Sequence, residues 1–127
     1  MEWKFNLREN KVLEVNAFGM FSNAGYLKMF EQVVTDPKWN TGMHMVVDFR
    51  DVAFNNLHFD DVVLSVNMHT QFDNLLGKGK IAAIHSNNKG FRLGSIYKEL
   101  SNPDIKSKLE IFRDYEEGIV WVCGDNE

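Results

Sequence analysis

The stretch that decides the fold class is residues 81–100, IAAIHSNNKGFRLGSIYKEL. Its first four residues are all apolar, which is typical of a short strand buried on both faces of a sheet. Asn88 is expected to cap a helix, because its side chain can accept a backbone hydrogen bond at a helix start. The apolar residues of that helix recur at helical spacing: Leu93, Ile96, Tyr97 and Leu100. A buried strand followed by an amphipathic helix is the repeating unit of an α/β domain.

The same alternation of strand and helix continues toward the N-terminus. Residues 43–49 include the apolar run Met45-Val46-Val47 and predict a second short buried strand. An amphipathic helix is expected after it, with apolar residues again at helical spacing: Phe59, Val62, Val63 and Val66. Farther upstream, Ser22 is expected to cap a helix that ends at Asp36-Pro37.

Both ends of the chain complete the pattern. Residues 109–112 predict the last strand, and the residues from Asp114 onward resemble a capping box that begins a short helix. Over residues 1–18 apolar and polar side chains alternate on either side of a polar turn at 9–11, which predicts an antiparallel hairpin. We therefore expect one α/β domain over residues 1–127, in the order ββαβαβαβα. Its five-stranded sheet is mostly parallel, with flanking helices and the N-terminal strand as an antiparallel edge.

The charge balance argues against nucleic acid as a partner. The chain has 14 Lys and Arg residues against 18 Asp and Glu residues, a formal net charge of −4. Such a chain lacks the broad positive field that attracts polyanions. The nearest approach to a basic patch is interpreted as a solvated face: Lys78, Lys80, Lys89, Arg92 and Lys98.

The single cysteine and the N-terminal residues indicate the compartment. Cys123 cannot form an internal disulfide, which fits a reducing environment, and its place in the apolar run 119–123 indicates a small buried hydrophobic residue. The first residues lack the basic region and apolar stretch of a signal peptide. No apolar run approaches the roughly 20 residues that span a bilayer. We expect a cytoplasmic protein with no membrane span.

Candidate binding residues are expected on the loops that follow the strands, because ligands of open α/β sheets gather beyond the carboxyl ends of strands. The candidates for contact with a ligand or partner are Asp48, Arg50, Asn55, Asn56, His58, His85, Asn88 and Arg92. Asp48 and Arg50 are interpreted first as an ion pair, and orientation of a small ligand is the alternative. Asn55 and Asn56 indicate a turn. Free N–H groups over residues 86–90, with two nearby cations, offer a place for an anion.

The four histidines do not indicate a metal site. His44, His58, His69 and His85 lie at least 11 positions apart, so no pair has the spacing of a helical or loop chelate. His69 falls on the apolar stripe of the second predicted helix and indicates a hydrogen-bonded core or boundary histidine. His85 ends a buried strand, and a structural role is favoured there over ligand binding or proton transfer.

Catalytic and cofactor motifs are absent from the sequence. It contains no nucleophile elbow, no P-loop and no dinucleotide-binding glycine motif. We therefore assign no catalytic residue, expect no cofactor and favour a non-enzymatic role.

Three segments together resemble a known family of small α/β proteins. They are VVDFRDV at 46–52, the strand-to-helix unit at 81–97, and LEIFRDYEEGIVWV at 109–122. In these segments the chain resembles the SpoIIAA-like, or STAS-like, proteins over almost its whole length. The resemblance implies the fold of that family and a non-catalytic regulatory role.

The resemblance also implies a switch that this chain does not carry. Better-known members of the family are anti-sigma-factor antagonists, which bind a kinase partner and are phosphorylated on a serine at the start of the helix after the third strand. The corresponding stretch here, residues 54–58, has no hydroxyl side chain, and the nearest serine, Ser65, falls inside the predicted helix. The wider fold group is similar to lipid-binding CRAL-TRIO domains, whose large cavity needs additional helices.

The leading hypothesis is a non-catalytic regulatory or binding domain for a partner protein or small ligand. One alternative is a carrier of a small apolar, lipid-like ligand. A less favoured alternative is a small enzyme that uses His85 with Asp48 or Arg50. A homodimer is also expected, because the N-terminal hairpin leaves an edge strand free to pair.

Overall fold

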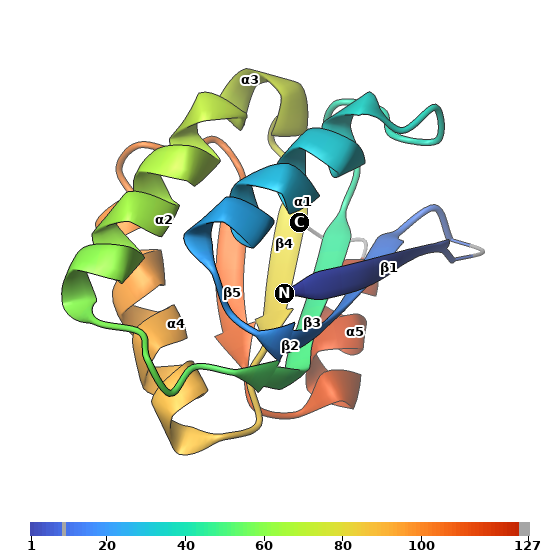
Figure 1. Ribbon diagram of the computed structural model, residues 1–127. Helices are drawn as coiled ribbons and strands as arrows, with labels where there is room; N and C mark the ends of the chain where they lie inside the picture. Colours follow the sequence, from blue (N-terminus) through green and yellow to red (C-terminus); the bar gives the residue numbers. More distant parts are fainter. Residues whose placement is uncertain (9, 125–127) are drawn as a thin grey trace.

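The structure is a computed structural model that describes residues 1–8 and 10–124 (Figure 1). In chain order its elements are β1 (Glu2–Leu7), β2 (Leu13–Met20), α1 (Asn23–Thr35), β3 (Met45–Ala53), α2 (Phe59–Gln71), α3 (Asp73–Leu76), β4 (Lys80–Ile84), α4 (Asn88–Ser101), β5 (Lys108–Phe112) and α5 (Tyr115–Cys123). The predicted α/β order is confirmed, with one additional helix, α3. Four residues are too few to show a helical period, so the sequence pattern does not reveal α3.

The five strands form one sheet in the order β1-β2-β3-β4-β5. β1 pairs with β2 in the antiparallel sense, and every other neighbouring pair is parallel. The expected mostly parallel sheet with an antiparallel N-terminal edge is therefore confirmed. The N–H of Arg8 donates to the carbonyl of Val12 at 2.9 Å and closes the turn between β1 and β2. Glu9, the first residue of the predicted turn, lies outside the described residues.

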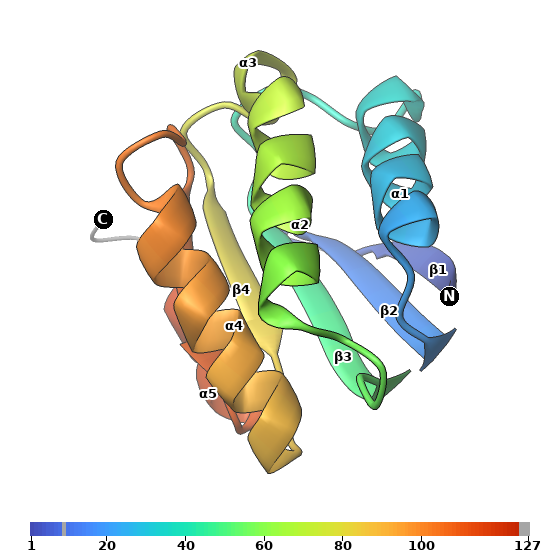
Figure 2. The same cartoon turned by 60° about the vertical axis from the view of Figure 1, so that its left-hand side comes forward.

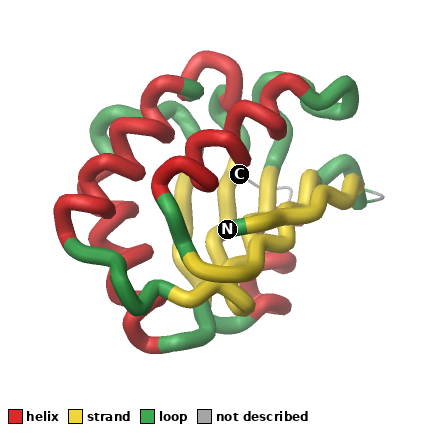
Figure 3. The backbone as a smooth tube through the Cα atoms, viewed as in Figure 1, coloured by secondary structure: helices red, strands yellow, loops and turns green. Residues whose placement is uncertain are grey.

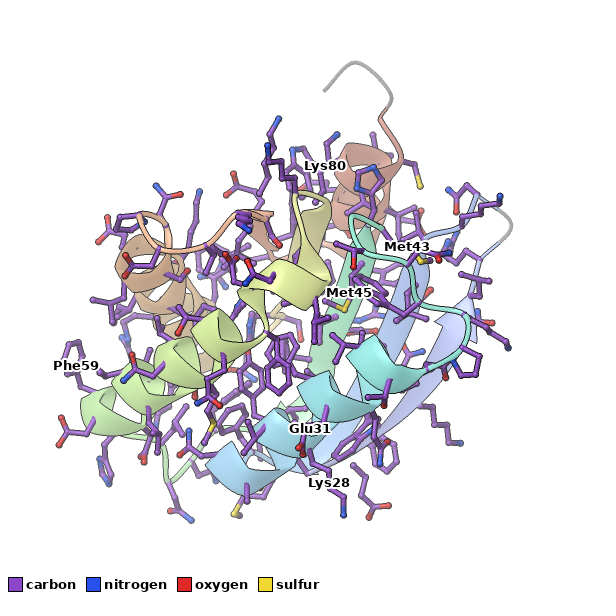
Figure 4. The ribbon with its side chains drawn as sticks, turned by 90° about the horizontal axis from the view of Figure 1, so that it is seen from above. Lys28, Glu31, Met43, Met45, Phe59 and Lys80 are labelled. Carbon is purple, nitrogen blue, oxygen red and sulfur yellow. The ribbon has the colours of Figure 1, made fainter. Side chains whose placement is uncertain are left out.

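The helices cover the two faces of the sheet unequally (Figure 2). α1, α2 and α4 lie on one face, and α5 packs on β3, β4 and β5 from the other. Met45 lies in the larger core under the three helices (Figure 4), and its neighbour Val46 lies in the smaller core under α5. The two neighbours enter opposite cores because successive strand side chains point to opposite faces.

β3 is longer than predicted. It runs to Ala53 instead of ending at Phe49, so Asp48 and Arg50 lie within the strand and not after it. The strand continues because β2 pairs with it as far as Met20, opposite Ala53. Pairing with a neighbouring strand is a tertiary contact. The polar residues in this half of β3 interrupt the apolar pattern, so the sequence does not reveal that the strand continues.

The helix caps are mostly as predicted. Ser22 caps α1 and Asp114 caps α5, each by accepting a backbone hydrogen bond from the first turn. The prediction that Asn88 caps α4 is wrong by one residue. The side-chain oxygen of Asn87 accepts from the N–H of Gly90 at 2.6 Å, so Asn88 is the first helical residue. Two adjacent asparagines offer the same capping chemistry, and only the backbone geometry selects between them.

Two side chains near α5 differ from prediction. Cys123 is exposed, because α5 turns the apolar run 119–123 about its axis and directs only part of it toward the sheet. Lys80, predicted on a solvated face, is only 3% exposed. Its ammonium group donates to the carbonyls of Trp121 and Gly124, at 3.0 and 3.1 Å.

The connections between elements gather at the two ends of the sheet (Figure 3). Because β3 and β4 are parallel neighbours, the loops that follow them leave the same end of the sheet. These two loops carry four of the eight predicted candidate residues: Asn55, Asn56, His58 and His85. Among the helices that the structure describes, none has the length and apolar character needed to cross a membrane.

Candidate functional site

A cavity of about 60 Å³ lies between the sheet and the layer of helices α1, α2 and α4. We call it the helix-side cavity. Its floor consists of apolar residues from β3, β4 and β5: Val47, Phe49, Ile81, Ala83, Leu109 and Ile111. These positions alternate along their strands, so the same pattern that buries each strand also builds the floor.

Aromatic rings form much of the wall. Phe21 and Phe54 stack with ring centroids 5.6 Å apart, and Tyr26 contacts Phe30 edge to face at 4.9 Å. On the sheet side, His85 stacks almost parallel on Phe49 at 4.8 Å. Packing of this kind holds the cavity-lining rings in fixed orientations.

A chain of hydrogen bonds crosses the cavity wall and joins three helices. The hydroxyl of Tyr26 in α1 donates to the hydroxyl of Tyr97 in α4 at 2.6 Å. The hydroxyl of Tyr97 lies 2.6 Å from Nδ1 of His69 in α2. The prediction that His69 is a hydrogen-bonded core histidine is confirmed, since the residue is 1% exposed.

Two buried imidazole nitrogens have no hydrogen-bond partner among the described residues: Nε2 of His69 and Nδ1 of His85. Both atoms are buried, and both residues line the helix-side cavity. Burial lowers the pKa of each histidine to about 4, and the opposing effects of Asp73 on His69 and Asp48 on His85 are smaller. Both rings are therefore neutral at pH 7.

Helix α4 approaches His85 closely because glycine occupies two successive turns. A Cβ at Gly90 would lie 3.0 Å from Nδ1 of His85, and a Cβ at Gly94 would lie 3.0 Å from the other edge of the ring. Larger residues at either position would press on the imidazole. The two glycines therefore allow the ring to fill the space between Phe49 and α4.

The predicted pair Asp48 and Arg50 lies on the opposite face of the sheet. The interpretation as an ion pair is confirmed, because the guanidinium of Arg50 donates to both carboxylate oxygens of Asp48 at 2.8 to 3.2 Å. The guanidinium also lies over the ring of Tyr115 in α5, 4.7 Å from its centroid. No hydrogen bond joins Asp48 to His85 in the described part of the chain, and the sheet separates their side chains.

Tyr115 links this pair to a second ion pair. Its hydroxyl donates to Glu14 at 2.8 Å and accepts from Arg8 at 3.2 Å, while Arg8 also donates to Glu14 at 3.0 Å. Burial and the Glu14 hydrogen bond raise the pKa of Tyr115 to about 12. We call this group the α5-side network: Arg8, Glu14, Asp48, Arg50 and Tyr115. Its charges are paired with one another, so it serves to join α5 to the sheet.

The remaining candidates lie on the surface. Asn55 and Asn56 form the predicted turn, and the Asn55 carbonyl accepts from Lys89 at 2.9 Å. His58 precedes α2 and is exposed, and Arg92 is exposed on α4. Asn88 accepts from the guanidinium of Arg113 at 3.0 Å. Of the eight predicted residues, only His85 lines the cavity.

Sequence reasoning missed Tyr26 and Tyr97 as site residues and treated His69 as structural only. Each of these polar residues lies on the apolar stripe of a different helix. A polar residue in such a position was the feature of the sequence that could have indicated a site residue. Their meeting depends on how α1, α2 and α4 pack, which no local pattern encodes. Over the residues described, no group of three or more metal-binding side chains is found.

Comparisons with known proteins bear on the fold. No protein-family model matches the chain, and no curated protein matches its sequence. Among solved structures, the chain is similar to an uncharacterized protein of the DUF3478 family from Shewanella loihica PV-4, described as having a SpoIIAA-like fold. The match covers 96% of this chain and 93% of that chain, with a TM-score of 0.62 and 11% sequence identity. This chain has a SpoIIAA-like fold.

The SpoIIAA-like fold was the one that the sequence segments resembled, and that expectation is confirmed. An identity of 11% carries no information about a shared site, so the likeness concerns fold alone. The side chains of the helix-side cavity are the remaining source of functional information.

Proposed function

We propose that this chain is a non-catalytic binding domain that takes up a small molecule in the helix-side cavity. The observation that carries the proposal is the helix-side cavity itself, whose lining is apolar and aromatic apart from one serine, two tyrosines and two histidines. A small molecule that enters this space gains from the burial of its apolar surface.

The volume of the cavity supports a small ligand over a lipid-like one. A cavity of about 60 Å³ is far below the roughly 300–1,000 Å³ typical of sites for drug-sized ligands. This argues against the lipid-carrier alternative, whose acyl chain needs more room.

The arrangement of polar groups supports binding over catalysis. The enzyme alternative required His85 to act with Asp48 or Arg50, and those two lie on the α5 side of the sheet, paired with each other.

The phosphorylation switch lacks support as well. Ser65 is 3% exposed in α2, where its hydroxyl donates to the Asp61 carbonyl and accepts from Asn23. We include in this proposal the cytoplasmic location that the sequence predicts.

Fragment screening by saturation-transfer NMR tests the proposal. The panel contains molecules of up to about eight heavy atoms, charged and uncharged, and two variants accompany the wild-type protein. Ala83→Leu adds three carbons to the cavity floor and is expected to abolish binding. Ala24→Leu makes the same change at an exposed position of α1 and is expected to leave binding intact.

The outcome is decided by the variants. Fragments that bind the wild type and Ala24→Leu, and lose binding in Ala83→Leu, support the cavity as a ligand site. If no fragment binds, or if every fragment still binds Ala83→Leu in its folded state, the proposed function is wrong.

A further inference from the structure

We infer that the ion pair between Lys98 and Glu110 closes the β5 edge of the sheet, so that another copy of the chain can add a strand only at β1. The inference does not depend on the helix-side cavity. It concerns the two edges of the sheet, because β1 and β5 are its first and last strands. A free edge carries unpaired N–H and C=O groups, which can pair with a strand of another molecule.

The free backbone groups of the β5 edge belong to Leu109 and Ile111. The N–H of Lys108 and the carbonyl of Phe112 form hydrogen bonds on the β4 side of the strand, at 3.0 and 2.8 Å. Backbone groups along a strand alternate between its two sides, so those of Leu109 and Ile111 point away from β4. Both of these side chains line the helix-side cavity, on the face that α4 covers. An added strand would pair with these two residues.

The ion pair passes around this edge. Glu110 lies between Leu109 and Ile111, so its side chain points to the opposite face of the sheet, as does that of Phe112 in the core under α5. Lys98 comes from α4 on the helix side, and its ammonium group donates to Oε1 of Glu110 at 2.6 Å. A contact between the two faces of an edge strand has to run outside the strand. It therefore occupies the space that an added strand needs.

A second contact covers the end of the same edge. Arg113 directly follows β5, and its guanidinium lies over the ring of Phe91, 4.1 Å from the centroid, and donates to Asn88 at 3.0 Å. Both partners belong to α4, so this side chain also joins the edge to the helix. The β1 edge differs, because among the described residues no ion pair joins β1 to a helix.

Closing one edge limits how many copies can assemble. A sheet with two open edges can pair β1 of one copy with β5 of the next, and repetition of this contact gives an open-ended assembly. With β5 closed, β1 can pair only with another β1, and the assembly ends at two copies. The ion pair itself is partly exposed, so its contribution to folding stability is small and its removal should leave the fold intact.

The double variant Lys98→Ala, Glu110→Ala removes the ion pair without changing the net charge. Sedimentation velocity is expected to show species larger than a dimer and self-association about tenfold tighter than in the wild type, the effect of one additional hydrogen bond. The matched control Lys28→Ala, Glu31→Ala removes one cation and one anion from exposed positions of α1 (Figure 4) and should behave as the wild type. Lys98→Glu with Glu110→Lys rebuilds the pair in reverse and should also behave as the wild type.

Amide hydrogen exchange of the full chain locates the new contact. In the alanine double variant, the N–H groups of Leu109 and Ile111 are expected to become severalfold more protected as the protein concentration rises. In the wild type their exchange should not depend on concentration. The N–H of Lys108, which is already bonded within the sheet, is the internal reference.

The inference is wrong if the alanine variant associates no more than the wild type, or if its association leaves the exchange at Leu109 and Ile111 unchanged. It is also wrong if the charge-reversed variant associates as the alanine variant does. Concentration-dependent protection of the two amides in the wild type would show that the edge is open, and would overturn the inference as well. The wild-type exchange decides the matter even where the alanine variant does not fold.

Discussion

At Tyr97, a single hydroxyl group holds three helices together. It receives the hydrogen of Tyr26 and faces Nδ1 of His69, so α1, α2 and α4 share one hydrogen-bonded chain above the sheet. Burial raises the pKa of Tyr26 and of Tyr97 above the usual value for a tyrosine, so the neutral form of both hydroxyls is strongly favoured. The chain therefore stays uncharged across the physiological range of pH.

Tyr97→Phe should show how much this chain contributes to stability. The substitution leaves both Tyr26 and His69 with an unpartnered polar atom, so the free energy of unfolding is expected to fall by about 1–3 kcal/mol. Tyr26→Phe removes only the end of the chain and should cost less. Urea unfolding of the two variants and the wild type measures the difference. Equal stability of Tyr97→Phe and the wild type would contradict the prediction.

The two buried histidines should make the fold sensitive to acid. Their pKa values of about 4 in the folded state lie below the value of about 6.5 expected in the unfolded chain. Between these values the unfolded state binds more protons, so the free energy of unfolding falls as the pH falls from 6.5 toward 4. The stability that neutral burial contributes is fully present above pH 6.5. We expect a loss of about 2–3 kcal/mol per histidine across this window.

Urea unfolding at a series of pH values between 4 and 7 measures the effect. The double variant His69→Leu, His85→Leu removes both titrating groups and should show a clearly flatter dependence in this range. A slope in the double variant equal to that of the wild type would assign the acid sensitivity to other groups.

At the scale of elements, α5 differs from the other helices because it alone among the described helices packs on its face of the sheet. Its N-terminus is capped by Asp114, and its C-terminal carbonyls receive the ammonium group of Lys80 from β4. A cation at a helix C-terminus is favoured by the helix dipole as well as by the hydrogen bonds. Lys80 is thus a buried link between β4 and the end of α5.

Lys80→Met keeps most of the side-chain volume and removes the charge and both hydrogen bonds. We expect the free energy of unfolding to fall by about 1–3 kcal/mol, since the carbonyls of Trp121 and Gly124 lose their donor. Lys78→Met is the matched control, because Lys78 is exposed two residues earlier and should change stability little. Urea unfolding compares them, and a Lys80→Met protein as stable as the control would show that the buried link contributes nothing.

At the scale of the whole molecule, the edge strand β1 remains the basis for the predicted homodimer. Trp3 and Phe5 are half-buried, while Glu2 and Lys4 are exposed on the other face of β1. In an antiparallel pairing of two copies with Trp3 opposite Trp3, Glu2 of each chain would lie opposite Lys4 of the other. Opposite charges at paired positions favour that register.

Sedimentation velocity over a wide concentration range tests the dimer. We expect the wild type to associate and Lys4→Glu to shift toward the monomer, because the substitution sets like charges opposite one another. Lys28→Glu is the matched control. It makes the same charge change on an exposed position of α1 (Figure 4), and its association should equal that of the wild type. A wild type that stays a 14.7 kDa species throughout would remove the prediction.

The sequence by itself determined the order of strands and helices, the antiparallel edge and most helix caps. These features depend on local patterns, since apolar spacing and a capping side chain act over a few residues. It also placed His69 in the core and Asp48 beside Arg50, because both statements need only the stripe of one helix or the geometry of one strand.

Only the tertiary structure decided which polar groups meet. Tyr26 and Tyr97 lie 71 positions apart in the sequence and share a hydrogen bond because α1 and α4 pack over the same face of the sheet. Asp48 lies in β3, and His85 directly follows the neighbouring strand β4. Because successive side chains of a strand point to opposite faces, these two side chains lie on opposite sides of the sheet. This separation removes the pairing that the enzyme alternative required. The site therefore emerges from packing between distant elements, where no periodicity in the sequence reports which side chains will face one another.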